Sequence, residues 1–238
     1  MHQYKNEFGS TLYPFVPGHE IIGRVKDTGS QVTKYKKGDV VGVGYFINSC
    51  GHCPNCKSHE EQFCDNGITP TQNGKLSDGS TTKGGYSSCI VVNENYALRI
   101  PDKLETARAA PLLCAGITTY SALRHNQVGT GHKIAILGLG GLGHMAVKFV
   151  VSFGADVSVL SSSPLKEESA KALGAHHFIN TADQADLKAA IGSFDFIIDT
   201  VSTKHDCNVY LRLLKKDGTM IMLGVPPQNP QLAVGLLT

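Results

Sequence analysis

The second half of the chain alternates between short apolar segments and amphipathic segments. After Gly131, the apolar runs have the length of strands, and the segments between them show the 3.6-residue period of helices. The expected strands span 133–138, 156–160, 176–179, 194–199 and 219–224, and the expected helices span 142–153, 164–173, 183–190 and 203–215. Strands and helices that alternate in this way form a parallel sheet with right-handed crossovers. This half therefore predicts a doubly wound α/β fold, and its closing run QLAVGLLT indicates a chain cut before the sixth strand.

The first half of the chain has a different pattern. Over residues 18–100, β-branched runs such as IIGRV, DVVGVGYFI and YSSCIVV alternate with Gly-containing turn signals, as is typical of short strands in a compact β domain. A helical pattern follows over 104–124, with breaks near Pro111 and Gly116. We place the domain boundary near Pro111. The expected domains are a β-rich domain over 1–110 and an α/β domain over 111–238.

Composition and charge narrow the class of protein. The 238 residues include 22 Lys and Arg against 20 Asp and Glu, which leaves a formal net charge of +2 and argues against a nucleic-acid partner. The hydrophobic fraction of 41% is enough for a core of one or two domains. No apolar run reaches the roughly 18 residues of a membrane span, and the first residues lack the apolar core of a secretory signal. We therefore expect a cytoplasmic protein with no membrane partner.

Cysteine spacing predicts a metal site. Four of the seven cysteines lie within fifteen residues: Cys50, Cys53, Cys56 and Cys64. Four thiolates at such short spacing can enclose a tetrahedral zinc ion and leave no open position for a substrate, which is typical of a structural site. Two histidines inside the array, His52 and His59, are alternative ligands. A reduced metal site fits this clustering better than a disulfide framework.

A glycine-rich motif follows the apolar strand IAIL. Its G-x-G-x-x-G pattern lies between an expected strand and an expected helix, which is the context of a dinucleotide-binding loop. Gly138 would permit the tight turn, Gly140 would let the backbone approach a pyrophosphate, and Gly143 would allow close helix packing. The loop consists of Gly138, Leu139, Gly140, Gly141, Leu142 and Gly143.

The end of the next strand favours NADP(H) over NAD(H). An acidic residue at this position would bind the ribose 2′-hydroxyl of NAD, but the sequence has Ser161, Ser162 and Ser163, then Lys166. Hydroxyl donors and a cation suit a 2′-phosphate. The alternative is that the serines only cap the helix expected to start at Pro164.

These motifs together resemble a known enzyme family. The segment GHEIIGRVKDTG places Gly18, His19, Glu20, Gly23 and Gly29 at the spacing of the zinc signature of medium-chain alcohol dehydrogenases. With the cysteine array, GGYSSCIVV, APLLCAGITTYSALRH, GLGGLGH and SSSPLK, the whole chain resembles the cinnamyl-alcohol-dehydrogenase-like branch, and within it the bacterial NADP-dependent aldehyde reductases. The resemblance implies an incomplete GroES-like catalytic domain and a Rossmann domain that lacks its last strand.

The resemblance also implies site residues. His19 and Cys114 match two ligands of a catalytic zinc, and Glu20 matches a glutamate that approaches the metal during ligand exchange. His2 matches the proton-relay histidine, and the first zinc cysteine would lie before Met1. Residues matching the nicotinamide end of the cofactor site are Thr118, Thr200 and Gly224.

The function implied is hydride transfer between NADPH and an aldehyde to give a primary alcohol, with zinc polarising the carbonyl oxygen. The resemblance implies a homodimer, and the dimerising edge is expected to lie outside these 238 residues. With these segments absent, we expect the 238 residues alone to be inactive.

Three other hypotheses are a non-catalytic zinc- and nucleotide-binding remnant, an NAD-dependent polyol dehydrogenase and a nucleic-acid-binding zinc ribbon. Cys89 is expected in a strand and Cys207 in a helix, and neither is assigned a role.

Overall fold

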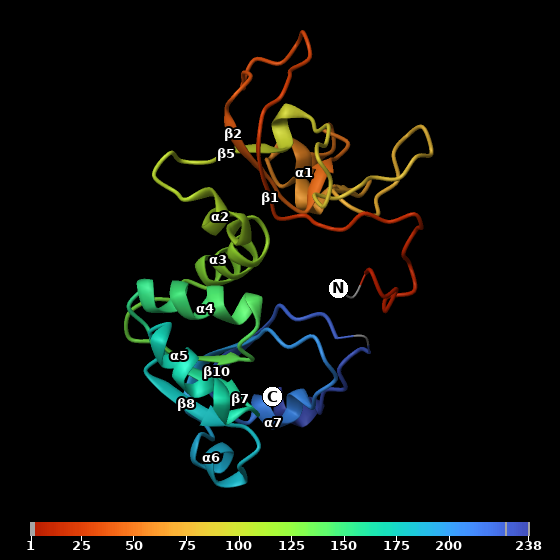
Figure 1. The fold of residues 1–238 in the computed structure, drawn as a ribbon. Helices are drawn as coiled ribbons and strands as arrows, with labels where there is room; N and C mark the ends of the chain where they lie inside the picture. The colour runs from red at the N-terminus through yellow and green to blue at the C-terminus, as the bar shows by residue number, and fades with distance from the viewer. Residues whose placement is uncertain (1–2, 227, 238) are drawn as a thin grey trace. The chain divides into compact units, whose positions relative to one another are not determined.

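The computed structural model describes residues 3–226 and 228–237. The chain divides into two compact units, residues 1–114 and 115–238, which are described separately below (Figure 1). The expected boundary at residues 110 and 111 falls inside the helical segment that precedes Cys114.

The first unit contains short strands joined by long loops. Its main sheet has the order β1-β2-β5 with antiparallel pairing, and β3 pairs with β4 in a second small sheet. The strands are β1 (Ile21–Arg24), β2 (Val40–Val43), β3 (Phe46–Asn48), β4 (Thr69–Pro70) and β5 (Ala97–Arg99). The short helices are α1 (Pro54–Lys57), η1 (Glu61–Phe63) and η2 (Glu94–Tyr96). The strands predicted from IIGRV and DVVGVGYFI are therefore present.

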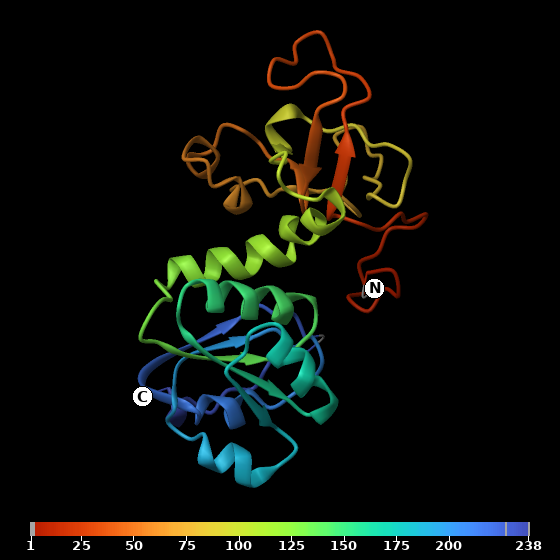
Figure 2. The same cartoon turned by 60° about the vertical axis from the view of Figure 1, so that its left-hand side comes forward.

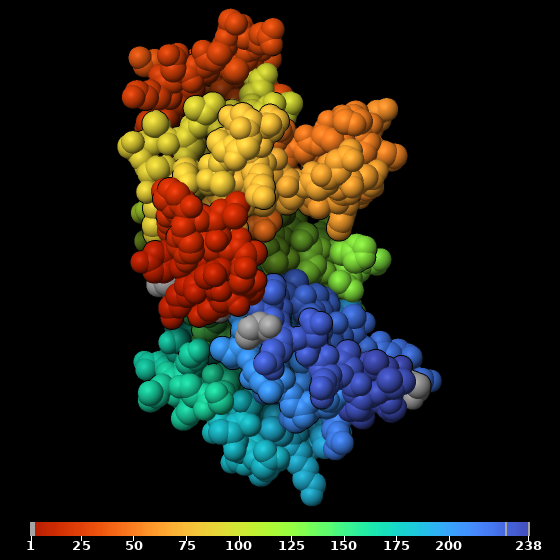
Figure 3. All heavy atoms as spheres, turned by 90° about the vertical axis from the view of Figure 1, so that its right-hand side faces the viewer, coloured from red at the N-terminus to blue at the C-terminus, as the bar shows by residue number. Residues whose placement is uncertain are grey.

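The strand expected from YSSCIVV is absent, so that prediction was wrong. The backbone N–H groups of residues 84–86 donate instead to carbonyls of residues 16–18. Figure 3 shows the red start of the chain lying against yellow residues of this later segment. Beyond it, Tyr86 and Val91 are 82% and 94% exposed, so their apolar side chains have no neighbouring strand to pack on. Cys89 is consequently an exposed thiol outside any strand.

A helical segment ends the first unit and begins the second. It consists of α2 (Thr106–Ala109), η3 (Ala110–Leu113) and α3 (Ala115–His125). The predicted break near Pro111 is confirmed, because the ring tightens the chain into a 3-10 turn that ends at Cys114. The predicted break at Gly116 was wrong. Gly116 is buried inside α3, where a buried face and the hydrogen bonds of the helix outweigh its low helix propensity.

The second unit is a five-stranded parallel sheet of order β10-β9-β6-β7-β8, which confirms the doubly wound architecture (Figure 2). Its strands are β6 (Lys133–Leu137), β7 (Asp156–Ser161), β8 (His177–Asn180), β9 (Phe194–Asp199) and β10 (Leu214–Met222). Its further helices are α4 (Gly141–Ser152), η4 (Pro164–Lys166), α5 (Glu167–Ala172), α6 (Gln184–Ala189), α7 (Cys207–Leu211) and η5 (Val234–Leu236). Among the described residues, no helix has both the length and the hydropathy that a membrane span requires.

Alternating residues of β6 supply both layers of the core. Ile134 and Ile136 pack with α3, α4 and α5 on one face of the sheet, while Ala135 and Leu137 pack with α6 and the start of β9 on the other. All four are 3% exposed or less. A strand buried on both faces explains the continuous apolar run IAIL.

The last helix and strand differ in their bounds from the prediction. Of the residues 203–215 expected to be helical, only those of α7 are, because Asp206 caps the start of α7 by accepting a hydrogen bond from the Asn208 N–H. Its end is fixed because the carbonyls of residues 212–213 accept hydrogen bonds from residues 192–194. Strand β10 therefore begins at Leu214 rather than at residue 219, with an irregularity in its register before Thr219.

Candidate metal and nucleotide sites

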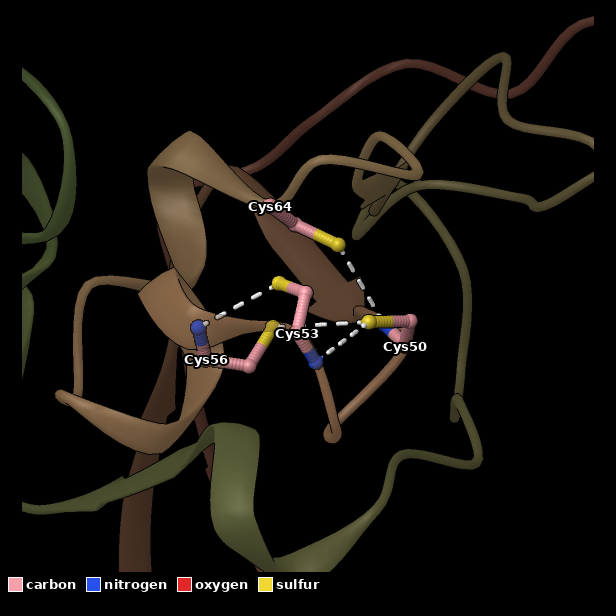
Figure 4. Close-up of side chains that lie close together, drawn as sticks. All are labelled: Cys50, Cys53, Cys56 and Cys64. Atoms are coloured by element: carbon pink, nitrogen blue, oxygen red, sulfur yellow. Dashed lines mark hydrogen bonds between the residues drawn. The ribbon is translucent and has the colours of Figure 1, made fainter.

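The four cysteines predicted to bind zinc lie together on the loop around α1 and η1 (Figure 4). Their sulfur atoms are all within 4.8 Å of one another, and the Sγ atoms of Cys50 and Cys56 are 3.9 Å apart. A tetrahedral zinc site with Zn–S bonds of about 2.3 Å has sulfurs about 3.8 Å apart. The arrangement therefore fits a closed four-thiolate site. His52 and His59, the alternative ligands, are exposed and do not belong to this cluster.

Backbone and side-chain donors around the cluster favour thiolates. The N–H groups of Cys53 and Cys56 approach the sulfurs of Cys50 and Cys53 at 3.3 and 3.4 Å, and Ser49 Oγ lies 3.1 Å from Cys56 Sγ. A hydrogen bond from the His52 backbone N–H is the largest cause that lowers the pKa of Cys50 to about 5. Donors aimed at sulfur stabilise the deprotonated form, which is the form that binds metal.

His19 and Cys114 form a second pair of metal donors. His19 Nε2 lies 3.1 Å from Cys114 Sγ, and both side chains are half-buried. The His19 ring also meets Tyr45 edge-on, with 5.4 Å between ring centroids. Burial is the main cause that lowers the pKa of His19, and it outweighs the opposing influence of the Glu20 carboxylate. A neutral imidazole and a thiol at this distance are suited to share one metal ion.

The other residues expected near a catalytic zinc are placed differently. Glu20 is exposed. The donor atoms of Glu20, His19 and Cys114 do not all lie within 4.8 Å of one another, as those of the four cysteines do. His2 lies outside the described residues. The pair of His19 and Cys114 is thus the part of that expected site that the fold brings together.

A cavity of about 950 Å³ adjoins His19 within the first unit. Its wall contains His19 and Glu20, apolar residues such as Phe15 and Ile21, and polar residues such as Gln72 and Arg24. Its size lies within the usual range for small-molecule sites. His19, one member of the metal-donor pair, therefore lies beside space for an organic ligand.

The glycine-rich loop connects β6 to α4 and has room for a ligand. Gly138 has a positive φ of +87°, and a side chain at Gly143 would approach the Gly138 carbonyl oxygen to 2.2 Å, so both positions require glycine. A Cβ at Gly140 or Gly141 would meet no atom within 4 Å. Gly140 is the N-cap of the twelve-residue helix α4 and has no side chain to bond to the N–H groups of the first turn. Those N–H groups and the open space fit a pyrophosphate.

The residues expected at a 2′-phosphate lie at the end of β7. Ser161 is buried, Ser162 is exposed and Ser163 is half-buried. Ser163 forms no side-chain capping bond, which contradicts the alternative in which it only caps the following helix. Lys166 Nζ lies 3.5 Å from the Leu139 carbonyl oxygen, so an exposed cation stands beside the glycine-rich loop.

Comparison with known proteins identifies the family. The alcohol dehydrogenase GroES-like domain matches residues 1–102, and the zinc-binding dehydrogenase domain matches residues 141–238. The chain is 54% identical over 227 residues to NADP-dependent alcohol dehydrogenase C 1 of Mycolicibacterium smegmatis and 49% identical over 228 residues to aldehyde reductase YahK of Escherichia coli. Each alignment covers 95% of this chain and 65% of the relative. The cinnamyl alcohol dehydrogenase of Helicobacter pylori, solved with NADP(H), superposes with a TM-score of 0.92 at 42% identity, covering 99% of this chain and 67% of that one.

The chain belongs to the zinc-binding alcohol dehydrogenase family. The expected GroES-like and Rossmann folds are confirmed by these matches. The chain spans about two thirds of the length of its curated relatives.

Two of the residues expected at the nicotinamide end of an alcohol dehydrogenase cofactor site, Thr200 and Gly224, contact backbone carbonyl groups. Thr200 Oγ1 donates to the Leu137 carbonyl oxygen at 2.8 Å and so joins the carboxyl ends of β9 and β6. A side chain at Gly224 would approach the Val201 carbonyl oxygen to 2.1 Å, so this close backbone contact requires glycine. Thr118 is half-buried on α3.

One group of reactive side chains in the second unit was missed by sequence reasoning. Asp199, His205 and Cys207 bring three possible metal-donor atoms within 4.8 Å of one another. The spacing His205-x-Cys207 is by itself only weak evidence for a metal site. Asp199 lies at the end of an apolar strand, and the sequence does not show which side chain it will contact.

Proposed function

We propose that the protein carries out NADP-dependent, zinc-assisted hydride transfer between NADPH and an aldehyde, with a primary alcohol as product. The single observation that carries this proposal is the 3.1 Å approach of His19 Nε2 to Cys114 Sγ beside the 950 Å³ cavity. A nitrogen and a sulfur donor next to ligand-sized space are two parts of a catalytic zinc site. The names of the relatives, an NADP-dependent alcohol dehydrogenase and an aldehyde reductase, support the same chemistry.

His19 and Cys114 would hold the catalytic zinc, and Glu20, which follows His19 directly, would exchange onto it. The bound ion would supply Lewis-acid polarisation of the carbonyl oxygen. Because His19 and Cys114 are half-buried, they would partly shield a carbonyl oxygen held there from water, which would strengthen charge interactions with it. The four cysteines would hold a separate, structural zinc without an open coordination position.

The second unit would bind and orient NADPH. Backbone N–H groups at the start of α4 would donate to the pyrophosphate, and Lys166 with Ser162 would contact the 2′-phosphate. No carboxylate stands at the end of β7 to bind a ribose 2′-hydroxyl, since that strand ends in Ser161. These contacts favour NADPH over NADH.

The substrate class and the cellular setting complete the proposal. The cavity beside His19 is lined in part by apolar residues such as Phe15 and Ile21, which suits an aldehyde that carries an apolar group. The clustered free thiols fit a reducing compartment, and we assign the protein to the cytoplasm. A homodimer is the expected assembly.

The test measures zinc content, NADPH binding and NADPH oxidation with a simple aromatic aldehyde in the native protein. His19→Asn and Cys114→Ser are expected to lower kcat/KM by about 100-fold or more while leaving NADPH affinity unchanged. Cys89→Ser, at an exposed thiol, is the matched control and should retain full activity. Parental turnover in both site variants, or a preference for NADH, would refute the proposal.

A further inference from the structure

Asp199, His205 and Cys207 form a buried cluster that the proposed reaction does not use. Asp199 is the last residue of β9, His205 lies on the following loop, and Cys207 is the first residue of α7. Asp199 and Cys207 are 1% and 2% exposed, and the His205 side chain is 13% exposed. All three belong to the second unit, and the cluster shares no residue with the four-cysteine site or with the pair of His19 and Cys114.

The hydrogen bonds of His205 direct one ring nitrogen into the cluster. Nδ1 lies 2.8 Å from the Thr203 carbonyl oxygen, which can only accept, so Nδ1 carries a proton. Nε2 lies 2.8 Å from Asp199 Oδ2, where Nε2–H donates because a carboxylate oxygen only accepts, and 3.6 Å from Cys207 Sγ. A bound metal ion would take the place of that proton. A backbone carbonyl that receives the distal N–H is the usual second partner of a metal-binding histidine, because it fixes the ring and its tautomer.

Asp199 is oriented in the same way. Its Oδ1 accepts a hydrogen bond from the Val201 N–H at 2.9 Å, which leaves Oδ2 directed at His205. Each of the two side chains therefore has one atom anchored to the backbone and one atom turned toward a common point. Cys207 supplies a sulfur at that point from the first turn of α7.

The distances fit a tetrahedral transition-metal ion with little movement. With Zn–N of about 2.1 Å and Zn–S of about 2.3 Å, a tetrahedral site has nitrogen and sulfur about 3.6 Å apart, and the observed separation is 3.6 Å. The same geometry has nitrogen and oxygen about 3.4 Å apart, so the 2.8 Å contact would have to open by about half an ångström.

Charge and donor type distinguish a metal site from a simple ion pair. An ion pair needs only the carboxylate and an imidazolium, and the buried sulfur would add nothing to it. A divalent ion would instead be neutralised by one carboxylate and one thiolate, which satisfies the need to compensate buried charges. A donor set of oxygen, nitrogen and sulfur suits zinc or cobalt and does not suit magnesium or calcium.

We propose that Asp199, His205 and Cys207 bind a divalent transition-metal ion of the zinc class at a further site in the second unit. The ion would hold the loop 200–206 against the carboxyl end of β9. The same loop carries Thr200, whose hydroxyl bonds to the Leu137 carbonyl oxygen before the glycine-rich loop, so the metal would stiffen the nucleotide-binding edge of the sheet. The site stands independently of the proposed dehydrogenase activity.

The test uses cadmium as a substitute for zinc and follows its NMR signals in the whole protein. The chemical shift of cadmium depends on the number of sulfur ligands, so the four-thiolate site gives a signal separate from those of the two sites with one cysteine, which are this cluster and the pair of His19 and Cys114. Cys207→Ser and His205→Asn should each lose one signal and one equivalent of metal per chain, while the four-thiolate signal stays. Cys89→Ser, the matched thiol control, should keep every signal.

A second measurement needs no variant. During titration of the parent protein with cadmium, the amide NMR signals of residues 199–207 should shift together with the appearance of the one-thiolate signal that Cys207→Ser removes. If those amides do not move, or if both variants keep the full cadmium spectrum and metal content, the three residues form only a buried ion pair beside a thiol and the proposal is wrong.

Discussion

His19 and Cys114 are separated by 95 residues in the chain, yet the imidazole Nε2 of one lies 3.1 Å from the thiol sulfur of the other. His19 lies two residues before β1, and Cys114 is where η3 ends and the chain turns into α3. Leu113, one residue earlier, is buried with Ile100 and Ala109 and packs near Gly42 of β2. The apolar packing of η3 on the strands thus positions a polar pair at the edge of the same core.

The four-cysteine cluster is expected to stabilise the first unit by binding zinc. Removal of zinc with a chelator should lower the thermal midpoint of the protein, because metal binding contributes directly to folding where four thiolates enclose it. Cys53→Ser should lower the free energy of unfolding by about 3 kcal/mol or more, as the loss of a metal ligand does. Cys89→Ser should change it by less than about 0.5 kcal/mol, since Cys89 is exposed. Equal melting curves with and without chelator would contradict this role.

Two alanine substitutions in the glycine-rich motif should separate folding from nucleotide binding. A Cβ at Gly143 would meet the Gly138 carbonyl oxygen at 2.2 Å, so Gly143→Ala should cost about 2 to 3 kcal/mol through overpacking. A Cβ at Gly140 meets nothing within 4 Å, so Gly140→Ala should leave stability nearly unchanged and weaken NADPH binding. Urea unfolding and NADPH fluorescence titration measure the two effects. Unchanged NADPH affinity in Gly140→Ala would mean that no phosphate approaches this backbone.

Lys166 is expected to determine cofactor preference. Lys166→Glu replaces a cation near the glycine-rich loop with an anion, so it should weaken NADPH binding by about 10- to 100-fold, equivalent to losing a charged hydrogen bond. NADH affinity should change little, because NADH has no 2′-phosphate. Lys188→Glu, at an exposed position on α6, makes the same change of net charge and serves as the control. Parallel losses of NADPH affinity in both variants would point to a general charge effect.

The contact of Asp195 with Lys215 should give stability a measurable pH dependence. Burial tends to raise the pKa of Asp195, but hydrogen bonds from Lys215 Nζ at 2.8 Å and the Lys133 N–H at 2.7 Å outweigh it, so the pKa lies below its usual value. Asp195→Asn should therefore cost about 1 kcal/mol at pH 7, a value kept small by the 40% exposure of Lys215.

The depressed pKa fixes the sign of that dependence. The unfolded carboxyl titrates near about pH 3.9, so the contribution of Asp195 is complete above that pH and is lost as the pH falls through the lower pKa of the folded state. The difference in unfolding free energy between parent and Asp195→Asn should shrink over that acid range, as followed by urea unfolding at a series of pH values. A double-mutant cycle with Lys215→Met isolates the pair. A difference that grows toward low pH would rule out this account.

Local sequence patterns were sufficient for most of the second unit. The alternation of apolar and amphipathic segments predicted the strands β6 to β9 and the helices between them to within a few residues, because both faces of a parallel strand must be buried and each crossover helix must bury one side. The same locality holds for the cysteine cluster and the glycine-rich loop. Their members are close in sequence, so spacing alone brings them together in space.

The sequence by itself thus determined the family resemblance, the doubly wound sheet, the cysteine cluster and the glycine-rich loop, since each depends on neighbouring residues. Only the tertiary structure decided that residues 86–92 form no strand, that the helix expected over 203–215 is confined to α7, and that Asp199 meets His205 and Cys207. A strand requires a partner edge, a helix end depends on which carbonyls are taken by other segments, and a side-chain cluster requires the loop that folds it. These partners lie far away in the sequence or on other elements, so no local pattern encodes them.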